Sequence, residues 1–178
     1  MKVNRSTKCT LKFANISKLD TLHTVLTEYG RVVNIFIDHF WSVGCPTKSE
    51  LLKPIVDIPS TWLSARLRKV AAREAIDMIT AVKAKDDDKL PKPTHKGQRM
   101  HVSCTIADLQ PSTVSSFDAW LHLSCIGNKL SLDIPIKFHK HYHQLRQMGK
   151  RLNSYIITKK YVQLCFEIET GPKKDVGE

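Results

Sequence analysis

The chain has 178 residues, 42% of them apolar, so it is long enough to bury a core and is not disordered by composition. Its 28 Lys and Arg exceed its 17 Asp and Glu, which gives a formal net charge of +11 at pH 7. Each basic side chain that meets a phosphate releases a condensed counterion, so this surplus favours a polyanionic partner. Nucleic acid is the first candidate, an anionic membrane surface the second, and an inert basic surface the alternative.

The cysteines and the N-terminus argue against secreted and membrane classes. Residues 1–13 lack the apolar stretch of a signal peptide, and no run approaches the roughly 20 apolar residues of a membrane span. We therefore expect a cytoplasmic protein with no membrane partner. The cysteines are odd in number and form no CxxC pair, which argues against a disulfide scaffold or a zinc ribbon: Cys9, Cys45, Cys104, Cys125 and Cys165.

The first half of the chain predicts one strand followed by two long helices. Residues 7–13 alternate between apolar and polar, as in a half-buried strand. From Ser17, which with Asp20 resembles a capping box, apolar residues recur at steps of three and four to about residue 43. This pattern predicts an amphipathic helix.

A connector and a second helix follow. Residues 44–60 contain Gly44 and three prolines and predict a connector with one short helical turn. Ser60 is a good N-cap for a helix over 61–85. An acidic run, two prolines and a glycine then predict a linker over 86–99.

After the linker the apolar period changes to two, which predicts strands. Hairpin turns are expected at 126–128 and 158–160. The predicted strands cover residues 100–106, 119–125, 129–136, 152–158 and 161–169.

A lone first strand is unstable, so it must pair with the later strands. The predicted fold class is therefore α+β: an antiparallel β-barrel with a helical insertion after the first strand. The expected boundaries are residues 1–14 and 95–172 for the barrel, 15–94 for the insertion and 173–178 for a flexible tail.

The stretch from Ile134 to Phe166 contains no Asp or Glu but is rich in Lys, Arg and His, with tyrosines interleaved. Cations follow phosphates and aromatic faces stack on unpaired bases, so this segment predicts nucleic-acid binding. The alternative is a solvated basic loop between two strands.

His139, His141 and His143 would share one face of an extended strand and could converge on Zn²⁺, as in a metal-dependent nuclease. The nearest acid in the sequence, Asp133, is no obvious partner to orient them. We expect instead a basic loop that gains charge at low pH, and we assign no metal ligands.

The second helix carries a basic stripe formed by Arg66, Lys69 and Arg73, with Arg68 beside it. Such a stripe can lie along a phosphate backbone, and the N–H groups at the start of the helix can meet a phosphate. The alternative is an ordinary solvated face, partly neutralised by nearby acids.

No catalytic motif accompanies these features. The sequence lacks GxSxG, GxxxxGK[ST] and GxGxxG. Asp86, Asp87 and Asp88 are consecutive in the linker, so their carboxylates diverge. We therefore expect no catalytic residues and no enzyme activity in this chain.

Three segments together resemble the N-terminal half of TnpB/OrfB proteins, the transposon-encoded RNA-guided nucleases related to compact type V CRISPR effectors. They are EYGRVVNIFIDHFW (28–41), WLSARLRKVAAREAIDMI (62–79) and SYIITKKYVQLCFEIET (154–170). The resemblance implies a wedge-type, OB-like β-barrel interrupted by a helical recognition lobe. It also implies guide RNA and target DNA as partners, with a short DNA motif read beside the target.

The sequence departs from that family at its end, because the RuvC-like carboxylates and the CxxC zinc ribbon do not follow. Asp175 follows two lysines rather than an apolar strand. The resemblance thus implies a split subunit, a shortened relative or a fragment, with Mg²⁺ needed only by a RuvC-bearing partner or domain. A second copy as partner and a stand-alone DNA- or RNA-binding regulator remain alternatives.

We expect the candidate binding residues to form one contiguous positive surface. By the resemblance, the start of the second helix approaches the adjacent-motif duplex and residues 137–160 meet the RNA. The candidates are Thr61, Ser64, Ala65, Arg66, Arg68, Lys69, Arg73, Lys137, His139, Lys140, His141, His143, Arg146, Lys150, Arg151, Lys159 and Lys160.

Overall fold

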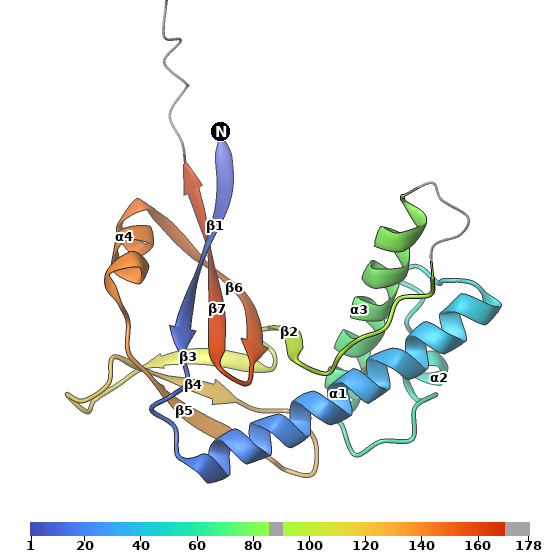
Figure 1. The fold of residues 1–178 in the computed structure, drawn as a ribbon, viewed down its shortest axis with the longest axis horizontal. Coiled ribbons are helices and arrows are strands. Elements are labelled where there is room, and N and C mark those ends of the chain that lie inside the picture. Colours follow the sequence, from blue (N-terminus) through green and yellow to red (C-terminus); the bar gives the residue numbers. More distant parts are fainter. Residues whose placement is uncertain (86–90, 170–178) are drawn as a thin grey trace, which may run out of the picture.

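The computed structural model describes residues 1–85 and 91–169, so the tail predicted at 173–178 and part of the predicted linker lie outside the described residues. In chain order (Figure 1), the elements of the described part are β1 (Lys2–Thr10), α1 (Ile16–Val43), α2 (Lys53–Val56), α3 (Ala65–Lys83), β2 (Arg99–Ser103), β3 (Ala107–Pro111), β4 (Ala119–Leu123), β5 (Leu132–Ile136), α4 (Lys140–Met148), β6 (Gly149–Thr158) and β7 (Tyr161–Glu169).

The strands form two antiparallel sheets, in the orders β1-β7-β6-β2 and β3-β4-β5. β1 pairs with β7 along its whole length, from Lys2 opposite Glu169 to Thr10 opposite Tyr161. The predicted α+β class and the pairing of the first strand with later strands are confirmed. Within residues 1–85 and 91–169, however, no strand pairing joins the two sheets, so the predicted closed barrel is not found.

Two elements differ from the sequence-based expectation. Residues 140–148 form the helix α4, where a loop or strand was predicted. Phe138 and Tyr142, four residues apart, stack with ring centroids 3.6 Å apart, and Tyr142 and Leu145 are buried. The steps of four and three residues between these apolar side chains are typical of a helix, but the alternating histidines at 139, 141 and 143 suggested an extended strand instead. The short strand β3 was also missed.

α1 begins at Ile16 and ends at Val43, close to the predicted bounds. Its N-cap is Asn15, whose Oδ1 accepts a hydrogen bond from the backbone N–H of Lys18 at 3.0 Å. Ser17 and Asp20, predicted as the capping pair, lie inside the first turns of the helix instead.

α3 begins four residues later than predicted. Its N-cap is Ser64, not Ser60, and Ser64 Oγ accepts from the backbone N–H of Leu67 at 3.1 Å. Leu63 forms a β-bridge with Gly127, which holds the chain before Ser64 extended. Because residues in this extended pairing cannot adopt helical geometry, the helix begins after Ser64, and Ser60 does not cap it.

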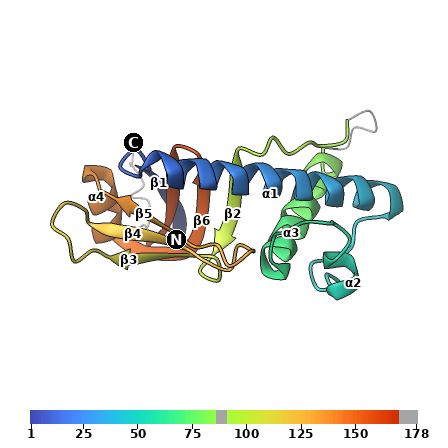
Figure 2. The ribbon, with the colours of Figure 1, turned by 90° about the horizontal axis from the view of Figure 1, so that it is seen from below.

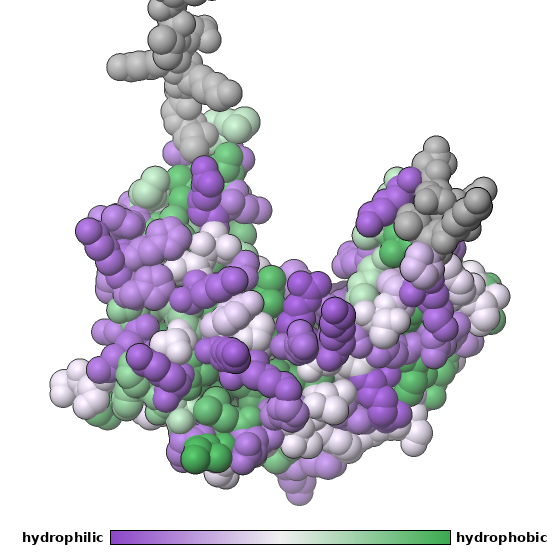
Figure 3. Space-filling model, viewed as in Figure 1, coloured by the Kyte–Doolittle hydropathy of each residue, from purple (hydrophilic) through white to green (hydrophobic). Residues whose placement is uncertain are grey.

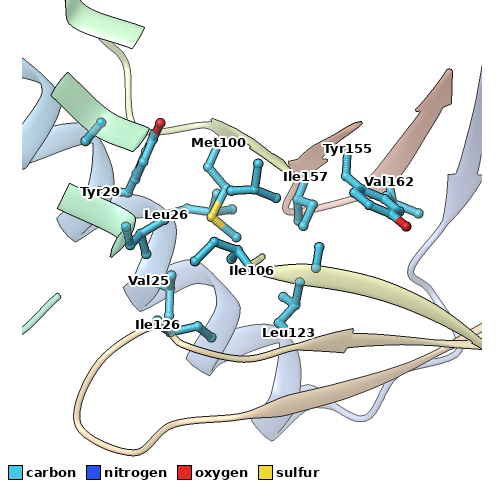
Figure 4. Close-up of a cluster of buried hydrophobic side chains, with 14 of the residues drawn as sticks. Val25, Leu26, Tyr29, Met100, Ile106, Leu123, Ile126, Tyr155, Ile157 and Val162 are labelled. Atoms are coloured by element: carbon cyan, nitrogen blue, oxygen red, sulfur yellow. The ribbon is translucent and has the colours of Figure 1, made fainter. Parts of the chain in front are cut away.

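α1 connects the strands to α3 through one continuous core. It runs along the length of the molecule, past the sheets and across α3 (Figure 2). Val25, Leu26 and Tyr29 point into the same cluster as buried side chains of the strands and their loops (Figure 4). The core therefore crosses the expected boundary between the barrel and the insertion. The strand-side members labelled in Figure 4 are Met100, Ile106, Leu123, Ile126, Tyr155, Ile157 and Val162.

The segment before β2 is fastened to α1. Asn34 donates from Nδ2 to the carbonyl of His95 at 2.9 Å and accepts from the N–H of His95 at 2.7 Å. Beside this pair, Gly97 has a φ of 62° and its backbone lies against Gly30 of α1. None of the helices in residues 1–85 and 91–169 is both long enough and apolar enough to cross a bilayer.

Replacing Gly30 by Ala should destabilise the protein, although Ala in a helix interior is normally favoured over Gly by about 0.5–1 kcal/mol. A Cβ at Gly30 would lie 2.4 Å from Gly97 Cα and 2.8 Å from Gly97 N. Forcing these two backbones apart should cost about 1–3 kcal/mol of unfolding free energy in urea titration.

Thr24→Ala is the matched control, because Thr24 is exposed on the same helix and its hydroxyl bonds only locally, to the carbonyl of Asp20. Its unfolding free energy should stay within about 0.5 kcal/mol of the native value. An unchanged or raised stability of Gly30→Ala would show that the two backbones do not pack as described.

Candidate nucleic-acid interface

The middle of the acid-free segment folds as α4 and the start of β6. α4 buries Tyr142 and Leu145 against the sheet, and the ring of Tyr142 meets Phe166 of β7 edge-on at 5.6 Å. Burial raises the pKa of the Tyr142 hydroxyl, so it remains a neutral group beside the cations. The exposed residues of α4 include Lys140, His141, His143 and Arg146.

A groove of about 310 Å³ lies between α4, β6 and the β3–β4 hairpin, and we call it the α4 groove. Its charged lining consists of Arg146, Lys150 and Arg151 together with one carboxylate, Asp118. Asp118 Oδ2 already accepts a hydrogen bond from the backbone N–H of Phe138 at 2.7 Å. Its other lining residues are Leu109, Pro111, Ala119, Phe138 and Tyr142.

Arg151 is held in place within this groove. Its Nη1 donates to the hydroxyl of Tyr155 at 2.6 Å, and its guanidinium lies 5.6 Å from the centre of the Tyr155 ring. Both contacts restrict the side chain before any ligand arrives, which lowers the entropy lost on binding.

Two of the three histidines meet, and the third lies elsewhere. His139 Nε2 donates to the carbonyl of Lys8 at 2.9 Å, and His139 Nε2 and His141 Nδ1 lie 3.3 Å and 3.1 Å from the hydroxyl of Thr7. His143 instead meets the rings of Phe138 and Tyr142 edge-on. The premise of an extended strand was wrong, because His141 and His143 lie on a helix. Among residues 1–85 and 91–169, no group of three His, Cys, Asp or Glu could hold a metal ion.

The start of α3 uses its polar groups internally. The hydroxyl of Thr61 donates to the carboxylate of Glu28, which also accepts two hydrogen bonds from Arg31. The bonds from Arg31 hold the pKa of Glu28 below its ordinary value. Ser64 caps the helix and donates to the carbonyl of Cys125. The hydroxyls predicted to approach a nucleic acid are therefore engaged within the protein.

The basic residues of α3 line two grooves, although Lys69 and Arg73 lie one turn apart on the same side of the helix. Arg66 and Lys69 are near Ala65 on a surface shared with Lys53 of α2, where Arg68 pairs with Asp57 at 2.9 Å. Arg66 Nη1 also approaches the carbonyl of Thr105 at 3.4 Å. Arg73, one turn beyond Lys69, lines a second groove.

We call this second groove the α3 groove. It occupies about 440 Å³ between α3 and β2, and it lies in the hollow between the two arms of the molecule, whose floor is hydrophilic (Figure 3). Arg73 lines one wall and Arg99 and His101 the other, with Lys48 paired to Asp77 at 2.6 Å. Sequence reasoning missed Lys48, Arg99 and His101, and no local pattern marks them, because three separate segments meet here.

A buried polar network supports the floor of the α3 groove. Tyr29 donates from its hydroxyl to Glu74 at 2.6 Å, and His95 Nε2 lies 3.4 Å from the same carboxylate. Because His95 Nδ1 accepts from the N–H of Gly97, Nε2 carries the proton of the neutral ring. Arg99 Nε is 3.9 Å from Glu74, so the carboxylate also orients a cation of the groove.

The remaining predicted cations lie elsewhere. Lys159 and Lys160 occupy the turn between β6 and β7, where Lys159 donates to His23 Nε2 at 3.2 Å. Lys150 is at the other end of β6, roughly 30 Å away at the rise of an extended strand. Lys137 lies near Phe13 and Phe117. The expectation of one contiguous surface is therefore wrong, and the candidates form separate groups.

No protein-family model and no curated protein matches this chain.

Replacing Glu74 by Gln should lower the unfolding free energy by about 1–3 kcal/mol at pH 7, because the buried donors lose a charged acceptor. Burial would raise the pKa of Glu74, but the contacts from His95 and Tyr29 outweigh it and lower the pKa below its ordinary value. Because the pKa of Glu74 is lower in the folded protein than in the unfolded chain, its charge stabilises the fold. This contribution is complete at a pH above the pKa of the unfolded chain and is lost as the pH falls through the pKa of the folded protein.

The difference in unfolding free energy between the native protein and Glu74→Gln, measured by urea titration, should therefore decrease as the pH falls below about 4.5. Asp77→Asn removes a neighbouring charge that is mostly exposed, and its effect should be within about 0.5 kcal/mol at either pH. A gap that stayed constant from neutral to acidic pH would contradict the charged network.

Proposed function

We propose that this chain binds structured RNA as the nucleic-acid-binding part of an RNA-guided DNA-targeting system similar to TnpB. The observation that carries the proposal is the convergence of Arg146, Lys150 and Arg151 on the α4 groove. These three cations face a single carboxylate whose hydrogen-bonding capacity is already partly used by Phe138 N–H. An excess of fixed positive charge around a groove attracts and orients a phosphate backbone.

The chemistry of the groove suits a phosphate backbone. A guanidinium can bind a phosphate through two parallel hydrogen bonds, whereas a lysine contributes a mobile point charge. Arg146, in the last turn of α4, is exposed and lines the groove. A phosphate backbone lying in the groove would thus meet charge from both α4 and β6, with Arg151 already oriented by Tyr155.

The α3 groove offers a second cationic channel, which we assign to the guide–target heteroduplex. Cations line both of its walls, and Arg73 makes no ion pair within the described part of the chain. Backbone recognition of this kind leaves sequence reading to base pairing. For the adjacent DNA motif, the exposed Arg66 is a better candidate than Thr61 and Ser64, whose hydroxyls are engaged internally.

The proposal includes a finer assignment of the fold. The two sheets are taken as an opened, wedge-type and OB-like barrel, and residues 15–94 as a recognition lobe that shares its core. Cleavage of the target DNA would be carried out by a RuvC-bearing partner chain or domain with its own Mg²⁺, since the residues of this chain are assigned to binding alone.

Binding of a fluorescein-labelled RNA stem–loop, followed by fluorescence anisotropy, should weaken steeply between about 50 and 200 mM salt because several phosphate contacts release counterions. The double variant Arg146→Gln/Lys150→Gln should bind more weakly and reduce the slope of log affinity against log salt by about 2, one for each phosphate that the variant no longer neutralises. Arg151 is left unchanged to preserve its bond to Tyr155.

The control is Lys85→Gln/Lys92→Gln, which removes the same charge from the part of the molecule beside the C-terminal ends of α3 and α1, far from α4 (Figure 1). Its affinity and salt slope should match those of the native protein. Equal losses of affinity in the two double variants would mean that net charge alone drives binding. An affinity that does not change with salt would contradict the proposed phosphate contacts.

A further inference from the structure

Three aromatic side chains cluster outside the core. Phe13 follows β1, Phe117 lies in the β3–β4 loop and Trp120 lies on β4. The ring centroids of Phe13 and Phe117 are 6.1 Å apart, and those of Phe117 and Trp120 are 5.7 Å apart. All three are half-buried, and none belongs to the hydrophobic core or to the half-buried residues packed against it. Core packing therefore does not account for their grouping.

Three lysines from different segments cover these rings. Lys12 lies 5.2 Å from the centre of the Phe13 ring, and Lys137 lies 5.2 Å from Phe13 and 5.8 Å from Phe117. Lys18 lies 5.6 Å from the centre of the Trp120 ring, and its ammonium donates to the carbonyl of Asp133 at 2.6 Å. Each ring of the cluster thus has at least one lysine ammonium over it.

The carboxylates nearby make hydrogen bonds to groups other than these lysines. Asp118 accepts from the N–H of Phe138, and Asp133 Oδ1 lies 2.6 Å from His122 Nδ1. Within residues 1–85 and 91–169, none of Lys12, Lys18 and Lys137 forms an ion pair. The cluster therefore combines half-buried aromatic rings with lysines that form no ion pair in the described part of the chain.

We propose that Phe13, Phe117 and Trp120, together with Lys12, Lys18 and Lys137, bind unpaired nucleotides. A base stacks on an aromatic face and displaces a lysine ammonium from it, and the freed ammonium meets the adjoining phosphate. Stacking on aromatic side chains combined with cations along the backbone is how proteins hold single strands without reading their sequence. This site rests on the proposed function for its class of ligand, but its residues are separate from those of the α4 and α3 grooves.

Trp120 provides a direct readout. In the variant Trp41→Phe/Trp62→Phe, Trp120 is the single tryptophan of the chain. We expect oligouridylate to quench its fluorescence saturably, whereas inorganic polyphosphate, which has charge but no bases, leaves it unquenched. Quenching by polyphosphate or by phosphatidylserine vesicles as strong as that by oligouridylate would overturn the proposal, as would no response to oligouridylate.

A pair of variants in the same background separates stacking from folding. Phe117→Leu keeps an apolar side chain but loses the π-face, and it should weaken oligouridylate binding about ten-fold. Phe117→Tyr keeps the π-face and should bind as the parent does. Equal affinities of the two variants would overturn the stacking role of Phe117.

The two proposals can fail independently. The double variant Arg146→Gln/Lys150→Gln should lose affinity for the RNA stem–loop but retain the quenching of Trp120 by oligouridylate. If this variant binds the stem–loop normally and Trp120 is still quenched, the α4 groove fails and the stacking site stands. If the double variant loses stem–loop binding as expected, but oligouridylate does not quench Trp120 in the Trp41→Phe/Trp62→Phe protein, the stacking site alone is contradicted.

Discussion

The antiparallel pairing of β1 with β7 is the interaction on which the rest of the structure depends. It joins the first strand to the last strand of the described residues, so the intervening residues must leave and return to one sheet. The inner face of this sheet supplies buried side chains from β1, β6 and β7, including Cys9, Tyr155 and Phe166. Loss of this pairing would expose that face and leave β1 without a partner.

Two consequences follow for the distribution of charge. α1 leaves β1 and packs against both the strands and α3, which sets α3 opposite β2 and creates the α3 groove. α4 precedes β6 and covers the other end of the sheet, which places Arg146 beside Lys150 and Arg151. The basic surplus of the sequence thus becomes several separate cationic surfaces. A partner that engages more than one of them must be extended, as RNA and its duplexes are.

The long regular elements could be predicted from the sequence, whereas α4, β3 and the composition of the grooves could not. The 28 residues of α1 repeat one apolar period many times, and this repetition outweighs a local exception such as Gly30. In α4 only Tyr142 and Leu145 are buried, and two residues are too few to reveal a period beside three alternating histidines. At α3, Ser60 and Ser64 are both plausible caps, and the bridge between Leu63 and Gly127 selects the second.

The sequence by itself determined the α+β class, the positive charge and the position of the acid-free segment, because composition and repeated periodicity are local properties of a chain. Only the tertiary structure decided which cations share a groove, which hydroxyls are already occupied and which aromatic rings lie outside the core. Those properties depend on how segments far apart in the sequence are brought together, as Lys137 is with Phe13, or as Arg73 and Arg99 are on the two walls of one groove. Such arrangements arise from how the faces of helices and sheets pack, and this packing cannot be read from short segments of the sequence.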